Sequence, residues 1–134
     1  MGTVKVLNDD ELDPRAAAVF ADIRATRGTD FVNAFWRALA NHPETLETLW
    51  SDLKTTMAPG ALDPLTKEML YVAVSVANAC AYCVHSHTAA ARAKGMTDAQ
   101  HRELLEVIAM AQRTNGLVTA LGVPVDPEFE KSGR

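Results

Sequence analysis

The sequence predicts an all-α fold. Alanine and leucine dominate the composition, and the alternation of β-branched residues that is typical of strands is nearly absent. Turn-forming residues fall roughly 15 to 30 residues apart, a spacing that suits helices. The chain has 134 residues, which suits one compact domain, so we expect a single domain over residues 1–134.

The first half of the chain indicates two helices before residue 41. One helix is expected over about residues 13–27, because Pro14 suits a first helical turn and Gly28 suits a helix end. Thr29 or Asp30 can then cap a second helix. Its apolar residues have helical spacing and are Phe31, Val32, Phe35, Trp36 and Leu39.

A third helix lies between two breaks in this pattern. Asn41-His42-Pro43 opens it, and Met57-Ala58-Pro59-Gly60 closes it. Its apolar residues are Leu46, Leu49, Trp50 and Leu53. The two tryptophans of these helices are expected in core or subunit contacts.

The second half of the chain is more apolar. Residues 66–94 fit one long helix, or two helices with a break near residues 78–80. Gly95 ends this stretch, and residues 97–100 have the pattern of a capping box that opens the last helix. The tail over residues 123–134 is expected to be loose or to form an arm onto a neighbouring subunit.

Charge and hydropathy argue against several classes of partner. The net charge is −4 and no Lys/Arg cluster occurs, which argues against nucleic acid and anionic membranes. Residues 1–12 lack the apolar core of a signal peptide. The most apolar stretch, residues 69–84, contains Ser75 and Asn78 and is too short for a membrane span. We therefore expect a cytoplasmic protein.

The two cysteines form a C-x-x-C motif with a histidine close behind. On a helix, Cys80, Cys83 and His87 fall within an arc of roughly 60°. Cys83 and His87 are one turn apart and can touch, whereas His85 points to another face. A cysteine beside an imidazole near a helix N-terminus should have a lowered pKa. This arrangement indicates thiol chemistry.

Two other interpretations remain open at this point. Zinc could bind the two cysteines and His87, although structural zinc sites usually take a second Cys/His pair. The remaining histidines are isolated: His42, His85 and His101. Alternatively, the three residues could be packed in the core without any chemical role.

Glu68 is the acidic residue that could join the thiols. It lies in a very apolar stretch, on the strip Glu68-Val72-Ser75-Ala79 of one helix face. An acid at this position can also simply face solvent at a helix start, where the helix dipole favours a negative charge. In a continuous helix, Glu68 and His87 would be about 28 Å apart. They can meet only if the chain turns near residues 78–80. That turn would also place both cysteines in the first turn of a helix.

Together these residues resemble the core motif of the alkylhydroperoxidase D-like (AhpD-like) proteins, which belong to the carboxymuconolactone decarboxylase family. The pattern is Glu68-x11-Cys80-x2-Cys83-x3-His87, followed by Gly95. The likeness covers about residues 62–108. It implies an all-helical domain of about five to seven helices, with the C-x-x-C at the start of one helix.

The resemblance also implies an activity. It implies a thiol-dependent peroxidase, in which Cys80 and Cys83 cycle between dithiol and disulfide while Glu68 and His87 relay protons. No cofactor and no metal are expected. The implied partners are a hydroperoxide substrate, a dithiol reductant such as a lipoyl-bearing protein or another thiol carrier, and further copies of the chain in a trimer or hexamer.

The details of the relay follow from position. Because Cys83 lies one turn from His87, we expect Cys83 to attack the peroxide and Cys80 to close the disulfide. Tyr82 stands where well-understood family members have a relay histidine, and it is a candidate for lining the mouth of the site.

Alternative functions remain open. They are a dithiol–disulfide oxidoreductase or redox sensor without peroxide turnover, a decarboxylase-type lyase that uses a cationic anchor such as Arg92, and a helical oligomer without activity.

Overall fold

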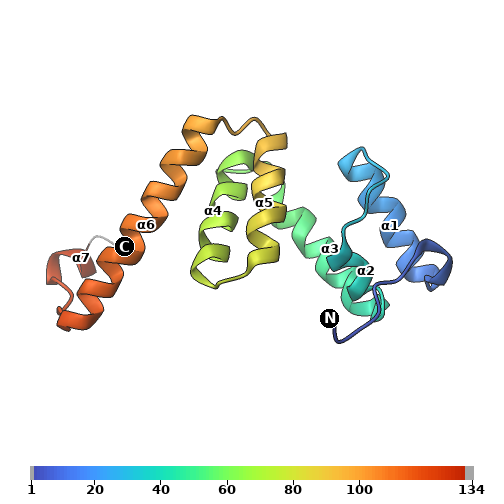
Figure 1. Cartoon of the computed structure of the whole chain (residues 1–134), viewed down its shortest axis with the longest axis horizontal. Helices are drawn as coiled ribbons and strands as arrows, with labels where there is room; N and C mark the ends of the chain where they lie inside the picture. The colour runs from blue at the N-terminus through green and yellow to red at the C-terminus, as the bar shows by residue number, and fades with distance from the viewer. Residues whose placement is uncertain (1, 132–134) are drawn as a thin grey trace. The chain divides into compact units, whose positions relative to one another are not determined.

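The structure is a computed structural model that describes residues 2–131. Over these residues it contains α-helices, one short 3-10 helix and no strand, which confirms the all-α class (Figure 1). None of these helices is both long and apolar enough to cross a membrane. The chain divides into two units, Met1–Ala58 and Pro59–Arg134, and each is described by itself. The single domain over residues 1–134 therefore stays a prediction.

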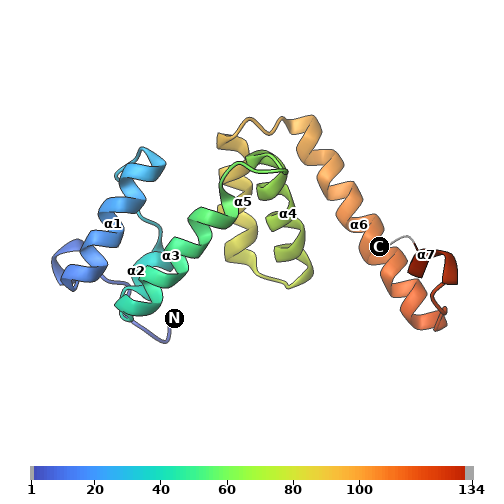
Figure 2. The same cartoon turned by 180° about the vertical axis from the view of Figure 1, so that it is seen from behind.

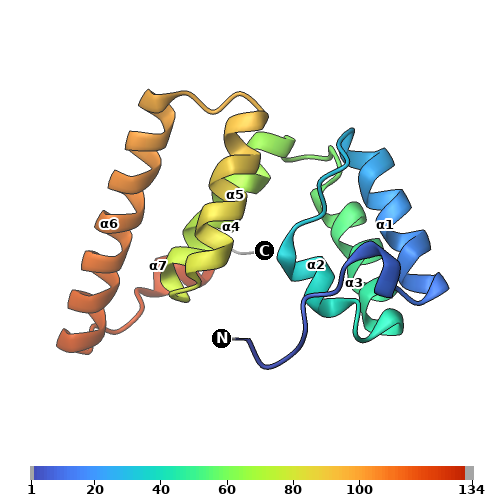
Figure 3. The same cartoon turned by 45° about the vertical axis from the view of Figure 1, so that its right-hand side comes forward.

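The first unit is a small helical cluster built around two tryptophans. Its elements are η1 (Asp9–Glu11), α1 (Pro14–Arg27), α2 (Ala34–Leu39) and α3 (Pro43–Met57). Both α1 and α2 pack against α3 (Figure 3). Trp36 and Trp50 meet edge to face with ring centroids 5.5 Å apart, and both are buried. The bounds of α1 and α3 confirm the predicted helices.

The second helix begins later than the sequence indicates. Its N-cap is Asn33 instead of Thr29 or Asp30, so residues 31–33 are not helical. Two arginine side chains explain the difference, because they take carbonyl groups that a helix would use. Arg24 donates to the carbonyl of Asp30, and Arg37 donates to that of Val32. The extended backbone also leaves Phe31 exposed while Val32 is buried.

The second unit carries four helices. They are α4 (Pro64–Ala77), α5 (Ala81–Ala93), α6 (Asp98–Leu121) and α7 (Pro127–Lys131). Helices α4 and α5 lie side by side and antiparallel, and α6 contacts α4 (Figures 1 and 2). The Thr97 side chain accepts from the Gln100 backbone N–H and the Gln100 side chain accepts from that of Thr97, which confirms the capping box.

A tight turn at residues 78–80 reverses the chain between α4 and α5. The N–H of Cys80 donates to the carbonyl of Ser75, and that of Ala79 donates to the carbonyl of Val76. These two bonds form a Schellman motif, which places Ala79 in the left-handed region with φ 55°. The predicted break is confirmed, and the alternative of one long helix over residues 66–94 is wrong.

This turn provides a stability prediction. An alanine at positive φ costs roughly 1 kcal/mol relative to glycine, which has no Cβ to clash there. Ala79→Gly is therefore expected to raise the free energy of unfolding by up to about 1 kcal/mol. Urea unfolding of both proteins checks this. A destabilised variant would show that the turn is not strained at this residue.

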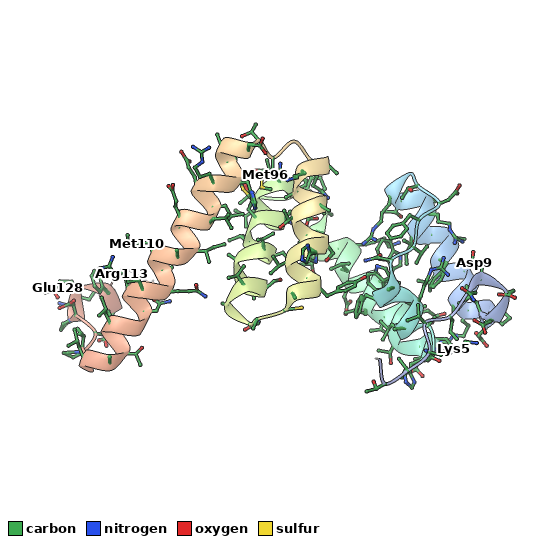
Figure 4. The ribbon with its side chains drawn as sticks, in the orientation of Figure 1. Lys5, Asp9, Met96, Met110, Arg113 and Glu128 are labelled. Atoms are coloured by element: carbon green, nitrogen blue, oxygen red, sulfur yellow. The ribbon has the colours of Figure 1, made fainter. Side chains whose placement is uncertain are left out.

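Helix α6 exposes most of its length. Within the described residues, Ile108 is the one buried residue of α6, and Met110 on the same helix is exposed (Figure 4). Met96, in the loop that precedes α6, is buried. The tail is not wholly loose, because Pro127–Lys131 form α7, where Pro127 suits a first helical turn. Residues 132–134 of the predicted tail lie outside the described residues.

Candidate active site: an imidazole, a buried carboxylate and a thiol pair

Glu68 is a buried acid on the inner face of α4. Its exposed fraction is only 5%, and Val72 and Ser75 are buried on the same face. Three members of the strip are thus buried on α4, whereas Ala79 lies in the turn beyond this helix. A buried carboxylate is costly unless charged or polar groups satisfy it, so its partners define the site.

His87 on α5 is the first partner. Its Nδ1 lies 2.7 Å from Oε2 of Glu68. A continuous helix would have separated these residues by about 28 Å. The antiparallel pairing of α4 with α5 brings them together instead. The structure therefore brings Glu68 and His87 into contact through the turn at residues 78–80 that this contact requires.

Lys94 at the C-terminal end of α5 is the second partner. Its Nζ donates to Oε1 of Glu68 at 3.1 Å, so each carboxylate oxygen has its own partner. Burial by itself raises the pKa of Glu68. The hydrogen bonds from His87 and Lys94 and the charge of Lys94 outweigh burial, and the net pKa lies below its ordinary value.

An ionised Glu68 determines which ring nitrogen of His87 carries the proton in the neutral imidazole. A carboxylate can only accept hydrogen bonds, so Nδ1 of His87 is the donor in the 2.7 Å contact. In the neutral imidazole, Nε2 then carries the lone pair and can accept a proton. The pair is thus arranged as an oriented base, a pattern that proton-transfer sites use.

Lys94→Met tests this electrostatic account. The lowered pKa of Glu68 means that its stabilisation is present above its unfolded pKa of about 4.3 and is lost as pH falls through the lower folded value. Without Lys94 the folded pKa rises, so we expect the variant to be less stable than the parent by about 1 kcal/mol near pH 7. The difference in free energy of unfolding between the variant and the parent should disappear below about pH 4.

Urea unfolding across this pH range measures the difference. The same substitution in a Glu68→Gln background is the control, because no carboxylate remains there to titrate. A pH-dependent gap that persists in that background would assign the effect to another group.

The two cysteines are free thiols at the start of α5. Cys80 is the N-cap residue, and its sulfur accepts the backbone N–H of Cys83 at 3.4 Å. The hydrogen bond from the Cys83 thiol and this N–H lower the pKa of Cys80. The same thiol–thiol bond, together with burial and the charge of Cys80, raises the pKa of Cys83. Cys80 is therefore the more acidic thiol.

This result bears on the order of attack. Proximity to His87 predicted that Cys83 attacks, but among residues 2–131 the hydrogen bonds of His87 include none to a sulfur. The helix N-terminus stabilises the thiolate at Cys80 instead. That Cys83 attacks the peroxide stays a prediction. The lower pKa of Cys80 favours Cys80 as the attacking sulfur instead.

Three other residues that the sequence analysis singled out lie on α5. Tyr82 is exposed between the cysteines, and His85 is exposed on α5. Arg92 donates to Asp98 at 2.8 Å. Over residues 2–131, no three His, Cys, Asp or Glu side chains form a group that could hold a metal ion.

Sequence reasoning missed two neighbours of the predicted site. Lys94 lies far from Glu68 along the chain, and no sequence pattern pairs the two residues. Tyr71 stacks on His87, with ring centroids 3.6 Å apart and planes 18° apart. Its position one helical turn after Glu68 could have indicated this, because residues three apart share a helix face.

Comparisons with known proteins agree with this geometry. Residues 43–126 match the model of the carboxymuconolactone decarboxylase family. The solved structure of the alkylhydroperoxidase AhpD core from Rhodospirillum rubrum is 61% identical in sequence and has a TM-score of 0.94, covering 96% of this chain and 97% of that one.

Two curated relatives match over shorter stretches. An alkyl hydroperoxide reductase AhpD from Solibacter usitatus is 37% identical over 65 residues, which are 48% of this chain and 35% of that protein. An uncharacterized protein of the cox locus of Paracoccus denitrificans is 39% identical over 56 residues, 42% of this chain and 50% of that protein. The chain thus covers half or less of these curated relatives. Since the family model matches more than half of the chain, the chain belongs to the carboxymuconolactone decarboxylase family, as an AhpD-like member.

Proposed function

We propose that this protein is a thiol-dependent peroxidase that reduces organic hydroperoxides. The observation that carries the proposal is the 2.7 Å contact between His87 and the buried Glu68. His87 lies on α5, the helix that also carries both thiols at its start. Peroxide reduction by thiols needs a thiolate and a proton for the leaving oxygen, which a dithiol and a nearby proton relay can supply. The likeness to an alkyl hydroperoxide reductase of Solibacter usitatus and to an alkylhydroperoxidase core of Rhodospirillum rubrum supports the same activity.

The chemistry proceeds in two steps. A thiolate of the pair attacks the terminal oxygen of the hydroperoxide, the O–O bond breaks, and the sulfur becomes a sulfenic acid. The leaving alkoxide takes a proton from the relay of His87 and Glu68. The second thiol then attacks the sulfenic sulfur, which forms the Cys80–Cys83 disulfide and releases water.

The disulfide must be reduced before the next turnover. A dithiol reductant supplies the two electrons and two protons, and becomes a disulfide itself. A lipoyl group on a carrier protein, or another dithiol carrier, has this chemistry.

Thiol counting tests the proposal. Reduced protein is mixed with one equivalent of cumene hydroperoxide, and its intact mass and free thiols are measured before and after. Loss of two hydrogens and of both thiols within seconds supports a peroxide-reactive pair. The variant with both cysteines replaced by serine is the blank. Thiols that stay unchanged in the parent protein would overturn the peroxidase.

A second function has an observation in its favour. Cys80 at a helix N-cap, with a lowered pKa, is also what a dithiol–disulfide oxidoreductase or redox sensor needs. Such a protein would exchange disulfides with a dithiol without consuming hydroperoxide. Rapid exchange with oxidised lipoamide, combined with thiols inert to peroxide, would favour this function.

The chain is also proposed to assemble as a trimer or hexamer. The supporting observation is the set of apolar side chains that α6 exposes along one side in this protomer: Val107, Met110, Leu117, Val118 and Leu121. Large apolar patches on a surface usually mark an interaction site. Copies of the chain are the partners that the proposal assigns to this face.

Charge on this face is expected to dissociate the oligomer. Met110 and Leu117 lie two turns apart on α6, so the double substitution Met110→Glu, Leu117→Glu places two charges on one side. Sedimentation equilibrium should then report a lower mass. Gln112→Glu, on the opposite side of the helix, is the control and should leave the mass unchanged. A parent protein that already sediments as a monomer would contradict the assembly.

A further inference from the structure

The His87 ring is held by two residues of α4. Glu68 accepts from Nδ1 at 2.7 Å, and Tyr71 covers a ring face at a centroid distance of 3.6 Å. Both residues lie on the same side of α4, one turn apart. The hydrogen bond directs one edge of the imidazole, but by itself it leaves the ring free to turn about that bond. The stacked ring removes this freedom.

The electrostatics of Tyr71 suit this role. Burial raises the pKa of its phenol, and the charges of Cys83, Glu68 and Cys80 raise it further. The phenol therefore stays neutral at the pH where Cys80, whose own pKa is lowered, ionises. A neutral aromatic face can also stabilise a stacked imidazolium, as cation–π contacts do, when His87 holds the relayed proton.

We propose that Tyr71 is a positioning residue whose ring face fixes the plane of the His87 imidazole, so that Nε2 keeps one direction for proton transfer. The inference deepens the proposed peroxidase and rests on it. The ring is the operative group, and the hydroxyl is not required. Positioning of a proton-transfer group is worth a large factor, because a displacement of about 1 Å can cost about 100-fold in rate.

Two substitutions separate the ring from the hydroxyl. Tyr71→Phe keeps the aromatic face, and Tyr71→Leu keeps only apolar bulk at a site that is 37% exposed. The first measurement is the rate of thiol oxidation by cumene hydroperoxide. Tyr71→Phe is expected to stay within about 3-fold of the parent, and Tyr71→Leu to fall by about 10- to 100-fold.

The second measurement does not depend on peroxide chemistry. In NMR spectra, the stacked ring shifts the His87 ring protons upfield, and the bond to Glu68 slows exchange of the Nδ1 proton. We expect both effects to persist in Tyr71→Phe and to be lost in Tyr71→Leu. Tyr71→Met serves as a second non-aromatic variant, and thermal unfolding confirms that each variant is folded.

The outcomes are distinguishable. If Tyr71→Phe loses as much rate as Tyr71→Leu, the hydroxyl is the operative group and the proposal is overturned. It is also overturned if Tyr71→Leu keeps the parent rate and spectrum. If the parent protein does not react with hydroperoxide at all, the peroxidase fails, and the NMR comparison alone decides whether Tyr71 positions His87.

Discussion

Replacing either cysteine by serine is expected to abolish catalytic turnover of hydroperoxide with a dithiol donor. Neither Cys80→Ser nor Cys83→Ser can form the intramolecular disulfide, so the cycle stops before the attack in one variant and after it in the other. We expect the steady-state rate to fall by at least roughly three orders of magnitude, because removal of a covalent nucleophile can cost about 10⁶-fold in rate. Peroxide consumption in the presence of dihydrolipoamide measures this loss. Turnover that survives both substitutions would exclude a dithiol cycle.

The same two variants assign the attacking sulfur. Once the second thiol is absent, the sulfenic acid persists and can be trapped with dimedone. An adduct in Cys80→Ser would place the attack on Cys83, as its proximity to His87 predicts. An adduct only in Cys83→Ser would place it on Cys80, in line with the lower pKa of that thiol. Serine at either position leaves Glu68 and His87 intact, so the relay is the same in both.

Glu68→Gln is expected to have the second largest effect. The amide keeps a similar shape but removes the charge that orients His87 and pairs with Lys94. We expect the rate of thiol oxidation by hydroperoxide to fall by about 100- to 1,000-fold, which lies within the range of about 10²- to 10⁴-fold that is typical of general acid–base catalysis. Stopped-flow mixing with free-thiol detection measures it.

The stability of this variant should change less than its activity. Because Lys94 is 40% exposed, water can replace the lost carboxylate around it, and we expect a cost of about 1–2 kcal/mol. Glu47→Gln, which breaks an exposed pair with Arg15, is the matched control and should leave both rate and stability nearly unchanged. Equal rates for Glu68→Gln and the parent would remove Glu68 from the relay.

Helix boundaries were the most predictable part of the fold. Gly28 and the capping box at residues 97–100 act within one turn, so the structure reproduces the helix ends that they indicate. The predicted start of α2 was wrong, because side chains from outside the first turn of the helix determine it. Arg24 and Arg37 reach it from elsewhere in the chain and take its carbonyl groups. Local patterns cannot show donors that arrive from another helix.

The candidate site divides in the same way. By itself the sequence determined the helical spacing of the cysteine pair and His87, and the place of Glu68 in an apolar stretch before them. Only the tertiary structure decided that Glu68 is buried against His87, that Lys94 pairs with the Glu68 carboxylate, and that Tyr71 covers the imidazole. Spacing along a helix follows from its 3.6-residue period, whereas these contacts depend on how two antiparallel helices pack.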